Sequence, residues 1–360
     1  MTDATSLHHQ SEYAKKMRPL LPAEAFLPSP EKAIILVLNL FILFAGWTIA
    51  VHLDQWPRQY VWLFIPIALI MGNSVTTIFF AYHELMHSQN VANRSLMAVL
   101  KILGSSLPLM PPTLWKALHN REHHNKTNSE DDPDRNYRIT QKITWARQVQ
   151  RIFVPSSDAS TPAMIVGIAI VWLFYTIRNL SSILFFNRSS VQFVPASFSV
   201  RPPERWRIGG EFLLILIIHV CVLTYLRFNP LTIVLAYIFP LLIGHAGAMF
   251  YIFTNHLLNP MTSINDPLIN SLSLRMPWWI DLLHLNFSYH VEHHIYPGMN
   301  SDYYPLVRKL LQDYYPKQYH VLGPIQAWKL LASTPRNYLD ENTLVDWSGD
   351  NPVPCPLTSI

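Results

Sequence analysis

Histidine is the residue type that most clearly points to functional chemistry, because eight of the sixteen histidines lie in three short clusters. Imidazole is neutral at pH 7 and is a good ligand for iron, copper, zinc or nickel. Eight such ligands are too many for one ion, so the pattern predicts a site for two metals. The clusters are His83-x-x-x-His87, His119-x-x-x-His123-His124 and His290-x-x-His293-His294.

The spacing within each cluster predicts which rings point the same way. On an α-helix, residues i, i+3 and i+4 share a face. We therefore expect His83 and His87 to form one pair, and the third cluster to form a three-pronged face. His119 and His123 would also share a face, which leaves His124 turned aside and free to reach a second metal.

One cluster also fits a different chemistry. His83-Glu84-x-x-His87 reads as the H-E-x-x-H motif of zinc proteases, with Glu84 as general base. That interpretation needs one zinc and one further ligand. It assigns no role to the six other clustered histidines, so we treat it as a remote alternative.

Long apolar runs must position these clusters. A helix needs about 20 apolar residues to cross a bilayer, and four runs meet this need: residues 33–51, 60–80, 211–228 and 231–253. Asn229 and Pro230 predict a tight turn that joins the last two runs. Residues 95–110 and 163–186 are ambiguous, because Lys101 lies in the first and Arg178 and Asn179 interrupt the second.

Basic residues indicate the orientation, because Lys and Arg stay on the cytoplasmic side. Residues 1–32 hold four of them, 111–160 eight, 187–210 four and 254–360 six, and the two short connections hold one each. This favours an all-α integral membrane protein with four transmembrane helices in two hairpins. The two ambiguous stretches would lie in the interface or dip in and return. The histidine clusters would then meet in a cytoplasmic helical cap.

Composition narrows the remaining possibilities. The net charge of +4 is too mild to suggest nucleic acid as a partner, and two cysteines cannot build a disulfide framework. A metal transporter would carry histidines within its spans, whereas these clusters lie outside the predicted ones. We expect a cytoplasmic segment at 1–32, a membrane domain at 33–315 and a loosely structured cytoplasmic extension at 316–360.

At the three clusters the chain resembles the membrane fatty acid desaturase superfamily, over about residues 33–315. The flanks agree as well, with Trp115 before the second cluster, Thr127 and Asn128 after it, and Tyr296-Pro297 after the third. The superfamily has four spanning helices, a cytoplasmic di-iron site and usually one more histidine before its third cluster. His256 stands at that place. His245 is its rival, but it lies inside the predicted fourth span, where a histidine more often hydrogen-bonds across helices.

The resemblance implies a set of iron ligands and a set of residues that orient them. Residues between or beside the histidines would accept N–H bonds from the rings; they are Glu84, Glu122, Asn255 and Glu292. Asp131, Asp132 and Asp134 would do the same or would only cap helices. The implied ligands are His83, His87, His119, His123, His124, His256, His290, His293 and His294.

The same resemblance implies O₂-dependent oxidation of a lipid acyl chain by two iron ions, with desaturation the commonest outcome. Lipid hydroxylases, carotenoid ketolases or hydroxylases, and alkene-forming fatty acid decarboxylases share the clusters, which do not separate these reactions. Electrons would come from ferredoxin, rubredoxin or cytochrome b5 with its reductase, because the chain shows no cysteine cluster or flavin fingerprint. The expected location is a bacterial inner membrane, or the endoplasmic reticulum in a eukaryote.

Overall fold

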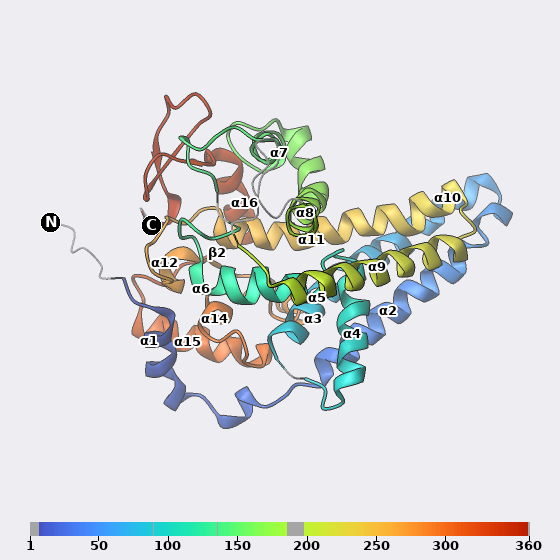
Figure 1. Cartoon of the computed structure of the whole chain (residues 1–360), viewed down its shortest axis with the longest axis horizontal. Coiled ribbons are helices and arrows are strands. Elements are labelled where there is room, and N and C mark those ends of the chain that lie inside the picture. The colour runs from blue at the N-terminus through green and yellow to red at the C-terminus, as the bar shows by residue number, and fades with distance from the viewer. Residues whose placement is uncertain (1–6, 89, 135, 186–197, 359–360) are drawn as a thin grey trace.

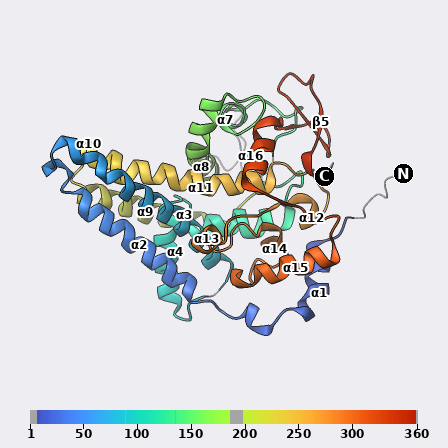
Figure 2. The same cartoon turned by 180° about the vertical axis from the view of Figure 1, so that it is seen from behind.

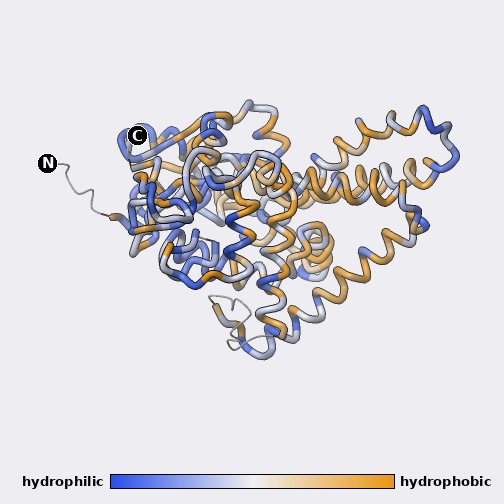
Figure 3. The backbone as a smooth tube through the Cα atoms, turned by 90° about the horizontal axis from the view of Figure 1, so that it is seen from above, coloured by the Kyte–Doolittle hydropathy of each residue, from blue (hydrophilic) through white to orange (hydrophobic). Residues whose placement is uncertain are grey.

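The computed structural model describes residues 7–88, 90–134, 136–185 and 198–358. Its long helices project to one end of the molecule, and both termini lie at the other end among shorter elements (Figure 1). The projecting part is largely apolar, whereas the end with the termini is mixed and more hydrophilic (Figure 3). The helices that project this way are α2 (Glu31–Ala50), α3 (Ile65–His87), α9 (Pro202–Tyr225) and α11 (Phe239–His256), the last preceded by α10 (Pro230–Ile233) and the π-helical turn η6 (Val234–Ile238).

Five helical segments of the described chain are long and apolar enough to cross a membrane. Four of them overlap the predicted spans, and the fifth is α8 (Thr161–Leu184), one of the two ambiguous stretches. In Figure 1, α8 is seen nearly end-on while α2, α9 and α11 run lengthwise. The other ambiguous stretch, α4 (Arg94–Ser106), also runs across the long helices. The apolar helices make this a membrane protein, and the count of four spans remains a prediction.

The predicted hairpin turn is present between α9 and α10. Arg227 and Phe228 adopt positive φ angles of 55° and 51°. The Asn229 side chain then accepts hydrogen bonds from the backbone N–H groups of Leu231 and Thr232, at 3.0 and 3.2 Å. Asn229 thereby satisfies two donors that the first turn of a helix leaves without intrahelical partners.

Helix α3 packs against both α2 and α11. The crossing with α11 is close, because a Cβ built on Gly244 would stand 2.3 Å from Val75 Cγ1. Thr76 Oγ1 donates a hydrogen bond to the Gly244 carbonyl across the same contact, at 3.3 Å. Small residues allow such close approach of membrane helices, and here they set the spacing between the two helices that end at histidines.

Helix α4 ends inside the bundle and the chain then turns back. Its last carbonyls need partners there, and two histidines provide them: His219 Nε2 donates to Ser106 O at 2.9 Å, and His245 Nε2 to Leu107 O at 3.0 Å. Leu109, with φ of 57°, reverses the chain towards α5 (Pro112–Trp115). His245 therefore makes the cross-helix hydrogen bond that the sequence predicted for it.

Short elements form the cap at the other end. The N-terminal helix α1 (Gln10–Met17) packs against α14 (His290–Ile295), and α15 (Tyr304–Tyr314) lies beside them (Figure 2). Tyr296 OH donates to Ala14 O at 2.7 Å and so ties the end of the third cluster to α1. Other helical elements of the cap include η5 (Lys116–His123), α6 (His124–Lys126), α7 (Trp145–Phe153), α12 (Pro267–Asn270), α13 (Trp278–Leu283) and α16 (Pro324–Ser333).

The expectation of a loosely structured C-terminal segment was wrong. Strands β3 (Asn337–Tyr338), β4 (Thr343–Val345) and β5 (Val353–Pro354) form an antiparallel sheet, and β2 (Val321–Leu322) pairs in parallel with β1 (Ser273–Leu274). The buried Arg336 side chain donates to the carbonyls of Pro155 at 2.8 Å and Leu331 at 2.5 Å. Strands of two or three residues are too short to show an alternating pattern, so the hydrophobic pattern of the sequence does not predict this sheet.

Candidate metal centre

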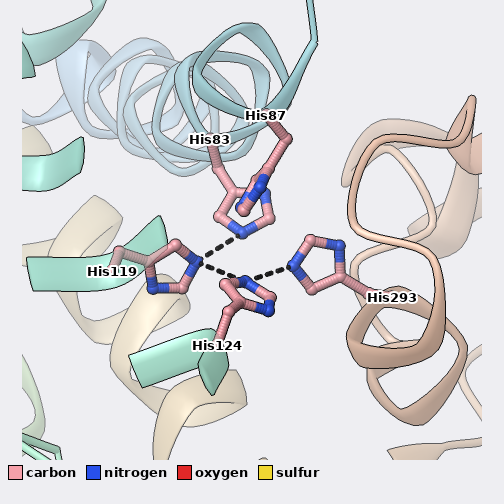
Figure 4. A group of neighbouring side chains, drawn as sticks. All are labelled: His83, His87, His119, His124 and His293. Atoms are coloured by element: carbon pink, nitrogen blue, oxygen red, sulfur yellow. Dashed lines mark hydrogen bonds between the residues drawn. The ribbon is translucent and has the colours of Figure 1, made fainter. Parts of the chain in front are cut away.

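Five histidines converge at the end of α3 that meets the cap, with one ring nitrogen of each within 4.8 Å of the others. His83 and His87 project from the last turns of α3, His119 and His124 come from the second cluster, and His293 comes from α14 (Figure 4). The Nε2 atom of His119 lies 3.0 Å from that of His83 and 3.2 Å from that of His124. His124 Nε2 in turn lies 3.1 Å from His293 Nε2.

The other four predicted histidines form a second group beside the first. His123, His256 and His294 bring ring nitrogens within 4.8 Å of one another. His290 joins them, because its Nε2 lies 2.6 Å from His256 Nε2 and 3.0 Å from His294 Nε2. The structure thus brings all nine predicted ligands together and divides them into five and four.

The second cluster divides differently from the α-helical expectation. The structure groups His119 with His124 and places His123 in the second group, whereas the spacing rule paired His119 with His123; these two also lie within 4.8 Å of each other, together with Asp134. The reason is local, because η5 (Lys116–His123) is π-helical. A π-helix follows an i→i+5 pattern and is frequent at functional sites, so residues five apart take the place of residues four apart.

Burial keeps five of the clustered rings neutral. It lowers their pKa well below its usual range, and the neighbouring rings add to the effect; the five are His119, His124, His290, His293 and His294. A neutral imidazole has one N–H and one lone pair. His119 Nε2 and His124 Nε2 each face two other ring nitrogens, which is more than one proton can bridge. Such converging lone pairs fit metal ions.

Side-chain and backbone groups around the site contact the Nδ1 atoms of three histidines, and these contacts orient the Nε2 atoms of the same rings towards the centre of the site. His293 Nδ1 lies 3.0 Å from Tyr304 OH, His294 Nδ1 lies 3.3 Å from Thr127 Oγ1, and His256 Nδ1 lies 3.4 Å from the Asn270 carbonyl. Partners of this kind fix ring orientation in metal sites. Sequence reasoning gave none of the three an orienting role. In the sequence, Thr127 stands out only because it closely follows the second cluster. The backbone carbonyl of Asn270 cannot be inferred from residue type, because every residue has one.

Asp132 orients His123. Its Oδ1 lies 3.0 Å from His123 Nδ1, and the backbone N–H groups of Asn128 and Asp134 donate to its two oxygens at 2.6 and 2.9 Å. Burial disfavours a charge on His123, but Asp132 and Asp134 outweigh it and raise the His123 pKa to about 8. Of the three aspartates left open by the sequence, Asp132 therefore faces a ring, whereas Asp131 is exposed.

The four residues predicted to orient the ligands have different surroundings. Glu84 Oε1 lies 3.5 Å from His83 Nδ1. Glu122 pairs with Lys126 at 2.8 Å, and Glu292 pairs with Arg308 at 3.0 Å. Asn255 is buried, and its side-chain amide has no hydrogen-bond partner among the residues that the structure describes. Glu122 and Glu292 thus pair with cations, and Glu292 fixes α14 rather than a ring.

Comparison with known proteins agrees with this geometry. The family model described as fatty acid desaturase matches residues 60–325, a range that includes all nine histidines of the two groups. The comparison with curated proteins returned no match. Because the family model covers well over half of the 360 residues, the chain belongs to the fatty acid desaturase family.

Proposed function

We propose that this oxidoreductase holds two iron ions and uses O₂ to desaturate a lipid acyl chain. The observation that carries the proposal is the division of nine inward-turned histidines into groups of five and four. Imidazole suits iron among other transition metals, and two separate groups call for two ions. The family match and the apolar helices support a lipid substrate within the membrane.

The protein's own residues would hold the metals and present the chain to them. When bound, iron with O₂ supplies the oxidising power that side chains lack for attack on an unactivated C–H bond. A cavity lined by Phe79, Trp172 and Phe287 adjoins the histidines. Its apolar wall would hold one part of an acyl chain beside the centre and keep water away, which is the positioning role a protein plays in such a reaction.

The electron supply would be external, from ferredoxin, rubredoxin or cytochrome b5 with a reductase. The chain has only two cysteines, so it cannot form a Cys₄ iron–sulfur cluster of its own. The distribution of Lys and Arg supports a cytoplasmic centre, in a bacterial inner membrane or the endoplasmic reticulum. An acidic donor would be attracted by the basic residues on that side.

The two remote alternatives find less support. A zinc protease would use His83, His87 and one further ligand, whereas these two rings share their group with three more histidines. A metal transporter would line a path through the spans with histidines. His219 and His245 lie well inside the candidate spans, and each is engaged by a backbone carbonyl, whereas His83, His87 and His256 lie at the ends of their spans.

Metal analysis and lipid analysis together test the proposal. The purified chain should carry about two irons and little zinc, and cells that express it should gain unsaturated acyl chains in an O₂-dependent manner. His293→Ala and His123→Ala, one from each group, should abolish turnover and lower the iron content. His52→Ala, an exposed residue between α2 and α3, is the matched control. One zinc per chain with unchanged lipids would contradict the proposal.

A further inference from the structure

Helix α13 presents an apolar face that no other described part of the chain covers. Four of its six residues are large, apolar and at least 43% exposed; they are Trp278, Trp279, Leu282 and Leu283. Asp281, its only charged residue, is buried and accepts a hydrogen bond from Ser288 Oγ at 2.5 Å. Six residues are too few to cross a bilayer, so the face belongs to none of the candidate spans. An exposed apolar patch of this kind marks a contact with a partner or a membrane.

Helix α13 is attached to the sides of two long helices. Thr77 Oγ1 of α3 donates a hydrogen bond to the Leu283 carbonyl at 3.1 Å. The ring of His284, the residue after α13, lies between α3 and α11. Its Nε2 is 3.2 Å from Asn73 Oδ1, and its Nδ1 is 2.9 Å from Tyr251 OH. These contacts hold this element of the cap against the side of the bundle.

The attachment points lie near one end of a predicted span. Thr77 and Asn73 belong to the apolar run 60–80, three and seven residues before its end on the side of the cap. At 1.5 Å per residue, they lie about 5 and 10 Å inside the apolar part of α3. An interfacial helix buries its apolar face by about 5–10 Å at the boundary between headgroups and acyl chains. Helix α3 therefore holds α13 at the depth of an interfacial helix.

Helix α2 gives a second measure of this depth. It packs against α3 and is joined to it by a short connection, so the two helices run in opposite directions. Because a Cβ built on Gly46 would lie 2.3 Å from Met71 Sδ, these two residues lie at one level. Phe41 comes five residues before Gly46 and therefore lies close to the level of Thr77. Its ring is 67% exposed, which indicates that lipid surrounds the bundle at this level.

The chain that follows α13 has the internal hydrogen bonding that lipid requires. Within a membrane no water pairs with free backbone groups, so irregular backbone must satisfy them itself. After α13 the chain reverses through Leu285 and Asn286, with φ angles of 56° and 57°. The N–H groups of residues 284–287 all donate to carbonyls of residues 280–284, at 2.8–3.5 Å. The reversal therefore keeps its own donors paired without water.

We propose that α13 is an interfacial helix whose Trp–Leu face lies in the lipid of the leaflet next to the cap. Tryptophan is enriched at membrane–water boundaries, because its amphipathic ring suits the level of the headgroups. The face continues the apolar surface of the spans. The contact also anchors the metal site, because Phe287, four residues after α13, lines the cavity beside the histidines. The centre of its ring lies 5.1 Å from that of His83.

Spin labels at three exposed leucines test the depth of α13. Leu282→Cys, Leu38→Cys on α2 and Leu339→Cys beside the C-terminal sheet are labelled in the full-length protein without Cys221 and Cys355, in phosphatidylcholine vesicles. Electron paramagnetic resonance measures collisions of each label with O₂, which concentrates in lipid, and with a water-soluble nickel chelate. The O₂-to-nickel ratio of Leu282→Cys should match that of Leu38→Cys. It should exceed that of Leu339→Cys by about tenfold or more, because apolar surroundings exclude polar solutes.

A ratio equal to that of Leu339→Cys would place α13 in water and overturn the proposal. Low collision rates with both reagents would mean that a second copy of the chain covers α13, which would overturn it as well. The three leucines are exposed, so the labels leave the packing of the fold intact. Neither iron nor turnover enters the measurement, so its result is independent of the proposed function.

The tryptophans of α13 allow a second test in a protein that keeps its cysteines. Bromine on lipid acyl chains quenches the fluorescence of an indole ring that contacts it. The wild type is compared with a Trp278→Phe, Trp279→Phe double variant and with Trp347→Phe, a partly buried residue just after β4, in phosphatidylcholine vesicles with and without bromine. The fluorescence that the double variant lacks should be lost in brominated vesicles, whereas the fluorescence that Trp347→Phe lacks should persist. Equal quenching of the two components would contradict a lipid contact at α13.

Discussion

At the scale of single residues, the metal centre depends on the groups that contact the Nδ1 atoms of its histidine rings. Tyr304, Thr127 and Asp132 each lie within 3.3 Å of an Nδ1 atom, and Asp132 is itself held by two backbone N–H groups. A ring that loses such a partner can rotate, which moves its lone pair away from the metal. Residues that never touch a metal should therefore control how tightly it is bound.

The adjacent aspartates 131 and 132 allow a matched test of this idea. Asp132→Asn should weaken iron binding by about 10- to 100-fold, the usual effect of removing a partner that orients a ligand, because His123 loses its anionic partner. Asp131 is exposed, so Asp131→Asn should leave iron binding unchanged. Iron retained after dialysis against a graded series of chelator concentrations measures both. Equal retention by the two variants would mean that Asp132 does not orient His123.

At the scale of elements, the two groups depend on the crossing of α3 with α11. Helix α3 ends at His87 and α11 ends at His256, and the two come from different groups. Their spacing is set where Gly244 meets Val75, because no Cβ fits there without displacement. A change at this crossing should therefore be felt at the centre as well as in the bundle.

Two glycine substitutions separate the crossing from general helix effects. Gly244→Ala places a Cβ against Val75 and should destabilise the fold by about 1–3 kcal/mol, as overpacking does. Gly210→Ala on α9 meets nothing within 4 Å, so better helix propensity should leave it neutral or more stable by up to about 1 kcal/mol. Thermal unfolding in detergent, read together with bound iron, measures both. A Gly244→Ala protein as stable as Gly210→Ala would show that α3 and α11 can separate without cost.

At the scale of the whole molecule, the arrangement requires that all three histidine clusters lie on one side of the membrane. Between the second and third clusters lie α8, α9 and the α10–α11 segment, each a candidate span. An even number of these must cross the bilayer. Helices α9 and α11 form the hairpin, and α8 runs across them (Figure 1). We therefore expect α8 not to cross.

Single cysteines test this topology in a background without Cys221 and Cys355. Ser157→Cys and Ser199→Cys lie before and after α8 at exposed positions. Both should react with a membrane-impermeant maleimide from the same side, because a crossing α8 would bury Arg178 at a cost of about 2.5 kcal/mol or more. Asp54→Cys, exposed between α2 and α3, should react from the opposite side. Labelling of Ser157→Cys and Ser199→Cys from opposite faces would show that α8 spans.

The sequence by itself determined the apolar helices, the hairpin turn and the three histidine clusters. Each of these depends on short-range spacing along the chain, which is visible without a fold. Twenty apolar residues, an Asn-Pro pair, and histidines three or four apart are local signals. The family resemblance, which rests on the same clusters, also identified His256. Spacing within a cluster could not identify it, because His256 lies outside all three clusters.

Only the tertiary structure decided how the histidine rings are divided between the two groups. The π-helical turn at Lys116–His123 places His119 beside His124 and puts His123 in the second group, and the spacing rule for α-helices does not describe such a turn. The packed C-terminal sheet and the partners of each Nδ1 atom bring together residues far apart in the chain, as Thr127 and His294 show. Likewise, Arg178 interrupts an apolar run in the sequence, and it lines the cavity beside the histidines only because α8 folds back across them.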